Sequence, residues 1–220
     1  MQTITTGKFI TLEGGEGVGK STQLDAVRAE LQAAGIEFVT TREPGGTTRA
    51  EKIRELLLER SQEPMPETCE LLLMFAARAT HLQNLILPNL QRGTWVVCDR
   101  FTDATFAYQG YARGLSLDQI EQLESWVQHG VQPDLTLLLD APVELAMQRA
   151  RARNQAQGQG AGDRFEVEQN SFFERVRQGY HARAAADATR FRIIDASQTL
   201  ATVTESVRAT IKAFITQQHS

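Results

Sequence analysis

A run of glycines that ends in a lysine and a hydroxyl residue is the first segment whose residue types and spacing indicate chemistry. Residues 14–21 read Gly-Gly-Glu-Gly-Val-Gly-Lys-Ser, which fits a Gly, four variable residues and then Gly-Lys-Ser/Thr. The glycines let backbone N–H groups approach phosphate oxygens, and the N-terminus of a following helix adds partial positive charge. In this pattern Lys20 reaches the β- and γ-phosphates and the Ser21 hydroxyl binds Mg²⁺. The run therefore predicts a site for a nucleoside triphosphate.

Acidic residues at the ends of two apolar runs are further candidates. Residues 95–98 lead into Asp99 and Arg100, and residues 135–139 lead into Asp140. In an open parallel sheet the carboxyl ends of the strands form the ligand crevice. We therefore expect Asp99 to hold Mg²⁺ through water or to orient Arg100. For Asp140 a cap on the helix that follows is the favoured interpretation, and a role in the ligand crevice is the alternative.

Three other segments have side chains suited to a nucleotide. The loop 41–47, Thr-Arg-Glu-Pro-Gly-Gly-Thr, follows an apolar run and is expected at the same sheet edge. Arg54 is either a second phosphate ligand or an exposed surface residue. Phe75 followed by Arg78 suits a stacked and hydrogen-bonded base, although helical periodicity alone favours a core position for Phe75. Gln109 has an amide that can pair with a base edge.

The order of apolar and helical segments indicates which elements position these residues. Between apolar runs lie longer segments with helical periodicity, which predicts an α/β fold with a parallel sheet covered on both faces. Pro88 is expected to kink or interrupt a helical stretch over roughly residues 67–92. The strand-like runs are 8–13, 36–41, 94–98, 135–140 and 190–195.

One polar, glycine-rich segment interrupts this alternation. Residues 154–162 are flanked by Arg149, Arg151 and Arg153 on one side and by Asp163-Arg164 on the other. A segment of this composition does not hold a packed conformation alone. Beside a triphosphate site, a loop bounded by arginines is typical of a lid that closes over phosphates, and a plain surface loop is the alternative.

The bulk composition narrows the class of protein. A length of 220 residues suggests one domain, and a net charge of −4 with a pI of about 5.6 argues against nucleic acid as a partner. Cys69 and Cys98 belong to no metal-binding or redox motif, and no export signal or long apolar run is present. We therefore expect a cytoplasmic protein that makes no contact with a membrane.

Taken together, the motifs resemble those of the thymidylate kinases, over residues 8 to about 200. They are Gly14–Thr22, the loop 41–47, Asp99-Arg100-Phe101 with Ala107-Tyr108-Gln109, and Asp163-Arg164 after a basic helix. The resemblance implies a three-layer P-loop NTPase fold with a five-stranded parallel sheet. It implies one kinase domain over residues 1–220, with a short mobile lid at residues 149–166.

The same resemblance implies the reaction and its partners. It implies transfer of the γ-phosphoryl group of ATP to dTMP, with Mg²⁺, in dTTP biosynthesis. It also implies a cytoplasmic homodimer formed by helix packing.

Matching positions to the family's motif implies the site residues. ATP would lie on Gly14, Gly15, Glu16, Gly17, Val18, Gly19, Lys20, Ser21 and Thr22, and Mg²⁺ on Ser21 and Asp99. Acceptor contacts would come from Glu16 on the 3′-hydroxyl, Arg54 and Arg100 on the phosphate, and Arg78, Thr105 and Gln109 at the thymine edge. Tyr108 would crowd the 2′ position, and either Phe75 or Met74 would stack on the base.

The implied catalytic groups are Lys20, Arg100 and a lid arginine. Gly17 stands where one branch of the family has an arginine in the P-loop, so the lid would supply that charge from Arg151 or Arg153, with Arg164 next. Ala104 replaces a serine usual in the family, which removes any hydroxyl contact there.

Two other functions remain as alternatives. A P-loop kinase for a nucleoside or another monophosphate would differ in its substrate preference. A nucleotide-switched binding protein would need an Asn-Lys-x-Asp guanine motif, and the sequence has none.

Overall fold

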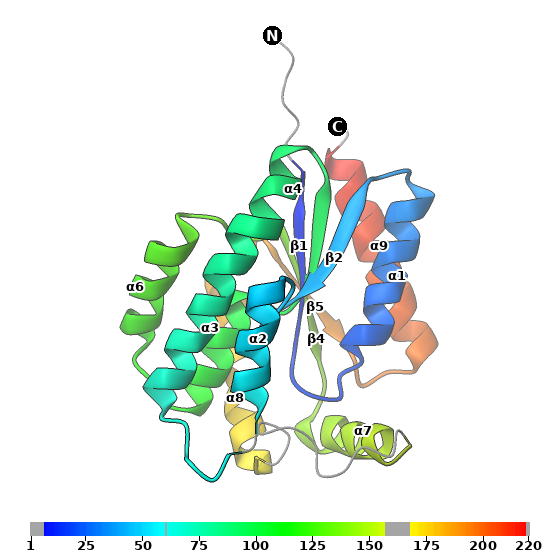
Figure 1. Ribbon diagram of the computed structural model, residues 1–220. Coiled ribbons are helices and arrows are strands. Elements are labelled where there is room, and N and C mark those ends of the chain that lie inside the picture. Colours follow the sequence, from blue (N-terminus) through cyan, green and yellow to red (C-terminus); the bar gives the residue numbers. More distant parts are fainter. Residues whose placement is uncertain (1–6, 60, 157–167, 219–220) are drawn as a thin grey trace.

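Five parallel strands form the centre of the molecule in the order β2-β3-β1-β4-β5 (Figure 1). The computed structural model describes residues 7–59, 61–156 and 168–218. The strands overlap the five predicted apolar runs, so the predicted α/β fold is confirmed. They are β1 Phe9–Glu13, β2 Phe38–Arg42, β3 Trp95–Asp99, β4 Leu135–Asp140 and β5 Phe191–Asp195.

Helices cover both faces of the sheet, as the sequence predicts (Figure 1). One layer consists of α1 (Lys20–Ala33) and α9 (Leu200–Gln218), which pack on each other. The other layer contains α2 (Thr48–Leu58), α3 (Glu67–His81), α6 (Leu117–Gln128) and α8 (Asn170–Ala186). Shorter helices are α4 (Leu87–Gln91), α5 (Thr102–Thr105) and the π-helices η1 (Leu82–Ile86) and η2 (Phe106–Ala112). The helix α7 (Val143–Ala156) follows β4.

The three central strands β1, β3 and β4 are largely apolar because both of their faces are buried, whereas the edge strands β2 and β5 are partly exposed. Successive side chains of a strand point to opposite faces, so Ile10 and Leu12 pack in the cluster that contains Val27 of α1 and Val207 of α9. Phe9 points the other way and stacks edge-on against Phe101, with ring centroids 4.9 Å apart. This two-sided burial is what gives parallel strands continuous apolar runs.

The interruption expected near Pro88 takes the form of a π-turn. Helix α3 ends at His81, and the five residues of η1 carry the chain into α4, where Pro88 lies at the start. Proline has no N–H to donate within a helix. In the π-helical turn η1 before it, the backbone hydrogen bonds span five residues instead of four. The side chain of Asn89 donates to the carbonyl oxygen of Leu85 at 2.7 Å, so this carbonyl keeps a donor.

The strand order brings the predicted site residues to one edge of the sheet. Strand β1 lies between β3 and β4, and its register pairs Leu12 with Asp99. The glycine-rich run after β1 therefore lies beside the Asp99-Arg100 pair after β3. Among the described residues, no helix is both long enough and apolar enough to span a membrane.

Candidate nucleotide-binding site

The glycine-rich run forms a tight loop between β1 and α1. Gly14, Gly17 and Gly19 have φ values of 134°, 72° and 93°, which favour glycine. The Lys20 ammonium donates to the carbonyl oxygens of Gly14 and Gly15, at 3.0 and 2.8 Å, so it lies inside the loop. Burial, together with the charge of Arg100, lowers the pKa of Lys20 to about 8. Ser21 is exposed at the start of α1, where its hydroxyl can reach a ligand.

Gly17 packs directly against the helix that leads to the predicted lid. A Cβ built on Gly17 would lie 1.8 Å from the carbonyl oxygen of Ala146 and 3.1 Å from the backbone nitrogen of Ala150, both in α7. Figure 1 shows α7 below the loop between β1 and α1. In this arrangement no side chain fits at position 17, and the loop has no arginine of its own.

Gly17→Ala is expected to lower both the thermal stability and the activity. The alanine Cβ forces the loop and α7 apart, and φ of 72° adds strain of order 1–2 kcal/mol, which corresponds to a drop in Tm of several degrees. Gly15→Ala is the matched control, because a Cβ at that position meets no atom of the described residues within 4 Å. Thermal unfolding of both variants tests the contact, and equal Tm values for the two would contradict it.

The Asp99-Arg100 pair has an unusual backbone that several contacts hold in place. Arg100 has φ of 66°, its N–H donates to the Leu12 carbonyl at 2.9 Å, and its carbonyl accepts from the Cys98 thiol at 3.0 Å. The next N–H, that of Phe101, donates to the Glu13 carboxylate at 2.7 Å. In the described parts of the chain, Asp99 Oδ1 is buried without a hydrogen-bond partner. A buried carboxylate oxygen of this kind fits a metal-bound water or a metal ion.

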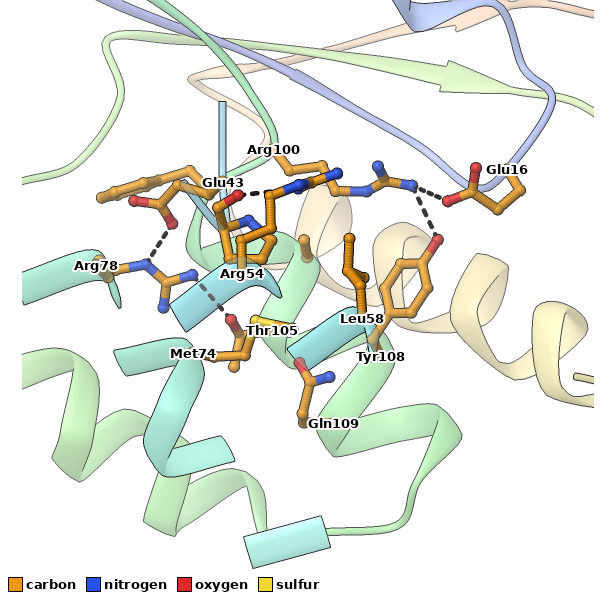
Figure 2. Close-up of a pocket in the computed structure, with 13 residues that line it drawn as sticks. Glu16, Glu43, Arg54, Leu58, Met74, Arg78, Arg100, Thr105, Tyr108 and Gln109 are labelled. Carbon is orange, nitrogen blue, oxygen red and sulfur yellow. Dashed lines mark hydrogen bonds and ion pairs between the residues drawn. The ribbon is translucent and has the colours of Figure 1, made fainter. Parts of the chain in front are cut away.

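The Arg100 guanidinium joins the loop to a cavity beside it (Figure 2). It forms an ion pair with Glu16 and donates to the Tyr108 hydroxyl at 3.2 Å. Burial alone would raise the pKa of Glu16, but the charges of Arg100, Lys20 and Arg153 outweigh it and lower that pKa to about 2. Glu16 therefore stays ionised at neutral pH and belongs to both the loop and the cavity.

The cavity collects nearly all of the predicted acceptor-site residues. Of those residues, only Phe75 is missing from its lining. The lining consists of Glu16, Glu43, Pro44, Arg54, Leu58, Met74, Arg78, Arg100, Phe101, Ala104, Thr105, Tyr108 and Gln109. Tyr108 and Gln109 come from η2, and π-helical turns of this kind are frequent at functional sites.

Phe75 and Met74 are the two alternatives for the residue that stacks on the base, and only one of them lines the cavity. Phe75 is 2% exposed and packs in a cluster with Leu71, Phe106 and Ile120, behind the guanidinium of Arg78. Met74, one residue earlier, lines the cavity instead. The one-residue difference turns the side chain by about 100° around the helix, which separates a core position from a cavity position.

Arg78 and Gln109 carry polar atoms at the end of the cavity away from Glu16. Arg78 Nε donates to Glu43 and its Nη2 donates to the Thr105 hydroxyl, at 2.8 and 2.9 Å. Gln109 Nε2 donates to a carboxylate oxygen of Glu70 at 2.7 Å, which leaves the amide oxygen of Gln109 as an acceptor. Within the described residues, Arg78 Nη1 is buried without a partner and is the donor left for a ligand.

The arginines of α7 occupy different surroundings. Arg149 donates to the carbonyl oxygens of Ala196 and Ser197, at 2.6 and 3.4 Å, and is thereby held at the loop after β5. Arg151 and Arg153 are exposed, and the charge of Arg153 reaches Glu16. The described part of the lid segment 149–166 ends at Ala156, so Arg164 and Asp163 lie outside the described residues.

Asp140 differs from the favoured expectation of a helix cap, because the contacts of its carboxylate among the described residues are with α8. It accepts two hydrogen bonds from Arg177 of α8, at 2.7 and 2.8 Å, and lies 3.2 Å from His181 Nε2. Burial raises the pKa of Asp140, but the hydrogen bond from Arg177 and the charge of His181 outweigh burial and lower it. Asp140 therefore joins β4 to α8.

Four buried residues near the site were missed by sequence reasoning. Glu43 lies within the noted loop 41–47, but the spacing of that loop gives no sign of the residues that Glu43 contacts. Glu13 ends β1 and accepts from the Tyr180 hydroxyl at 2.9 Å as well as from Phe101, and burial with the charge of Asp103 raises its pKa to about 8. The only sequence signal was an acidic residue in an apolar strand. The four are Glu13, Glu43, His81 and Tyr180.

Comparison with known proteins shows which family the chain belongs to. A family model described as thymidylate kinase matches residues 12–207. A thymidylate kinase of Chromohalobacter salexigens is 59% identical over 98% of this chain and 98% of its own length. Those of Teredinibacter turnerae and Alkalilimnicola ehrlichii are 54% and 52% identical, over 96% and 97% of this chain and 100% and 96% of their own. The chain therefore belongs to the thymidylate kinase family.

Proposed function

We propose that this protein transfers the γ-phosphoryl group of ATP to dTMP and so forms dTDP and ADP for dTTP biosynthesis. One observation carries the proposal: the phosphate-binding loop joins, through Glu16 and Arg100, a cavity whose other end holds Arg78 and Gln109. A triphosphate on the loop and a monophosphate in the cavity would meet at Arg100. Such a meeting point suits direct, in-line transfer, which needs positioning and charge neutralisation more than a covalent intermediate.

The polar atoms at the base end support thymine as the base. Arg78 Nη1 is a donor and the amide oxygen of Gln109 is an acceptor. The Watson–Crick edge of thymine has a carbonyl oxygen and an N–H, which match one donor and one acceptor. Cytosine has an amino group and an unprotonated nitrogen in those places, so both contacts would be mismatched. In the same proposal the Tyr108 ring excludes a 2′-hydroxyl, and Glu16 binds the 3′-hydroxyl.

Gln109→Ala is expected to weaken dTMP binding roughly tenfold, because the base N–H loses its acceptor in a buried place. ATP binding should change little, since Gln109 lines the acceptor cavity and lies outside the loop Gly14–Thr22. Gln132→Ala is a matched control, because Gln132 also donates to a glutamate, Glu124 at 2.7 Å, but is exposed and outside the cavity lining. Calorimetric titration with each nucleotide measures the effect; an unchanged dTMP affinity in Gln109→Ala would remove Gln109 from the base site.

The charged groups divide between the two phosphates. Lys20 and the loop Gly14–Thr22 would hold ATP, and Arg54 with Arg100 would hold the phosphate of dTMP. Ser21 and Asp99 supply hard oxygen ligands and would hold Mg²⁺, and the buried Asp99 Oδ1 without a partner in the described chain fits that role. When bound, Mg²⁺ neutralises charge on the β- and γ-phosphates.

The remaining features of the proposal concern the whole chain. Residues 1–220 would form one kinase domain with a lid at 149–166 that closes over ATP. Two free cysteines support a reducing cytoplasm as its location.

A homodimer is supported by exposed apolar side chains on three neighbouring helices, namely Leu56 of α2, Leu72 of α3 and Trp126 of α6, which is 74% exposed. The molar mass in solution tests the dimer.

A substrate panel tests the proposed reaction. ADP release is coupled to NADH oxidation in the presence of ATP, Mg²⁺ and each common nucleoside monophosphate in turn. dTMP is expected to be the preferred acceptor, with dCMP and the ribonucleotides far slower. Equal rates with dTMP and dCMP would overturn the assignment of the base site.

A further inference from the structure

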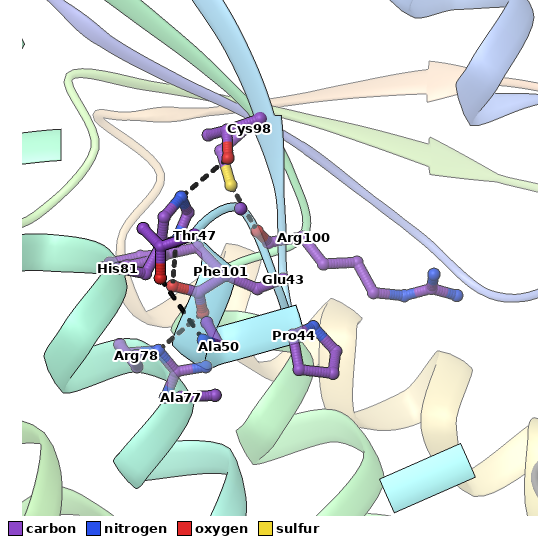
Figure 3. A network of polar contacts seen from close by, with 12 residues as sticks. Glu43, Pro44, Thr47, Ala50, Ala77, Arg78, His81, Cys98, Arg100 and Phe101 are labelled. Atoms are coloured by element: carbon purple, nitrogen blue, oxygen red, sulfur yellow. Dashed lines mark hydrogen bonds and ion pairs between the residues drawn. The ribbon is translucent and has the colours of Figure 1, made fainter. Parts of the chain in front are cut away.

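A carboxylate in the lining of the cavity connects two buried basic side chains (Figure 3). Glu43 Oε2 accepts from Arg78 Nε at 2.8 Å, and Glu43 Oε1 lies 2.9 Å from His81 Nδ1, which is the donor because an ionised carboxylate only accepts. His81 is completely buried, and its Nε2 lies 2.7 Å from the Thr41 hydroxyl. The chain of contacts therefore runs from β2 through α3 to the base end of the cavity.

Glu43 is fixed by its own backbone as well as by its side chain. Its N–H donates to the Asp99 carbonyl at 2.9 Å, which ties the loop after β2 to the end of β3. The same loop packs closely on His81, since a Cβ at Gly46 would lie 2.5 Å from His81 Nε2. The carboxylate therefore has little freedom to follow a guanidinium that moves.

The guanidinium of Arg78 is held on its faces and on two of its nitrogens. Its central carbon lies 4.9 Å from the Phe75 ring centroid and 5.2 Å from that of Phe101. Glu43 and Thr105 accept from Nε and Nη2, so the plane of the group is set. The direction of Nη1, the atom left for the base, then follows from the position of Glu43.

The charge of Arg78 also needs this carboxylate. Arg78 is 2% exposed, and a buried cation without a partner is strongly unfavourable. Burial alone would raise the pKa of Glu43, but the charge of Arg78 and the hydrogen bond and charge of His81 outweigh it and lower that pKa. Glu43 thus stays ionised and compensates Arg78 at the place where a neutral base would bind.

We propose that Glu43, oriented by His81, is a positioning residue that sets the selectivity of the cavity for its acceptor base by aiming Arg78. This inference rests on the proposed function, because it assigns the base to the Arg78 end of the cavity. If Glu43 had a merely structural role, its replacement would lower the stability of the protein and weaken the binding of both nucleotides. The positioning role predicts weaker binding of the acceptor alone.

Glu43→Gln tests this directly, because the amide has the same shape and loses the charge. Its dTMP Kd is expected to rise roughly tenfold and its ATP Kd to stay within about twofold of wild type, measured by calorimetry. Glu51→Gln is the matched control: Glu51 accepts from the Gly46 N–H at 2.8 Å, on the same loop, and pairs with Arg42 rather than with Arg78. It should bind dTMP as wild type does.

A double-mutant cycle with Arg78→Met separates an effect through Arg78 from any other effect. In the Arg78→Met background, Glu43→Gln should change the dTMP Kd less than about twofold, because the group that it positions is gone. Should Glu43→Gln unfold, Glu43→Asp keeps the charge but is too short to hold Arg78 in place, and it should show the same selective loss of dTMP binding.

Any of three results would overturn the inference. Glu43→Gln could leave the dTMP affinity unchanged, or it could weaken ATP binding as much as dTMP binding. It could also keep its full effect on the dTMP Kd in the Arg78→Met background. The proposed function is judged separately, by whether the wild-type protein phosphorylates dTMP at all.

Discussion

Lys20→Ala is expected to lower kcat for phosphoryl transfer by about 100-fold or more while the protein stays folded. The ammonium lies inside the glycine-rich loop, where it donates to the carbonyl oxygens of Gly14 and Gly15. Groups that stabilise charge in a preorganised, water-excluding site contribute about 10²-fold or more to kcat. Bound phosphates favour the ammonium form, which opposes the lowering of its pKa to about 8 by burial.

The measurement is kcat at saturating ATP and dTMP, with thermal unfolding as the check on folding. Lys52→Ala is the matched control, because Lys52 is an exposed lysine of α2 outside the cavity lining. It should keep wild-type kcat. Retention of more than about a tenth of the wild-type kcat by Lys20→Ala would contradict the role of Lys20.

Arg153→Ala is expected to lower kcat by about 100-fold and to raise KM for dTMP much less. Position 17 cannot carry a side chain, because α7 lies against it, so a further positive charge must come from another element. Arg149 is held by the carbonyl oxygens of Ala196 and Ser197, whereas Arg153 is exposed, donates to the side chain of its neighbour Asn154, and contributes to the low pKa of Glu16. A contact that forms mainly in the closed, transition-state arrangement affects kcat first.

Single alanine variants at positions 149, 151, 153 and 164, assayed at saturating substrates, test the lid. Arg153→Ala should show the largest loss, and Arg151→Ala is the next candidate among the described residues. If all four variants keep near-normal kcat, the lid only covers the site. Arg100 would then be the first residue to examine for the missing charge.

The sequence predicted the parts of the site that are local in the chain. The phosphate-binding pattern of the loop 14–21 is complete within eight consecutive residues. The alternation of apolar runs and helical segments predicted that Asp99 and Arg100 lie beside this loop. These predictions worked because strand periodicity and sheet connectivity limit the arrangements that are possible. The family's motif carried the acceptor residues position by position, and all of them other than Phe75 line one cavity.

The parts that the sequence could not predict depend on contacts between distant residues. Asp140 is bound by Arg177, which lies 37 residues later in the chain, so its local pattern resembles that of a helix cap. Glu43 meets His81 across 38 residues, and no spacing rule connects them. Met74 and Phe75 are adjacent and both apolar; helical periodicity favours a core position for Phe75, but that Met74 lines the cavity depends on how α3 packs.

The most direct test of the account is to follow the γ-phosphoryl group itself. The protein is incubated with Mg²⁺, dTMP and ATP labelled at the γ-phosphorus, and the nucleotides are separated. The account predicts that the label appears in dTDP in a one-to-one ratio with unlabelled ADP, and that dCMP in place of dTMP gives almost no labelled diphosphate. Label released as inorganic phosphate, or found equally in dCDP, would contradict it.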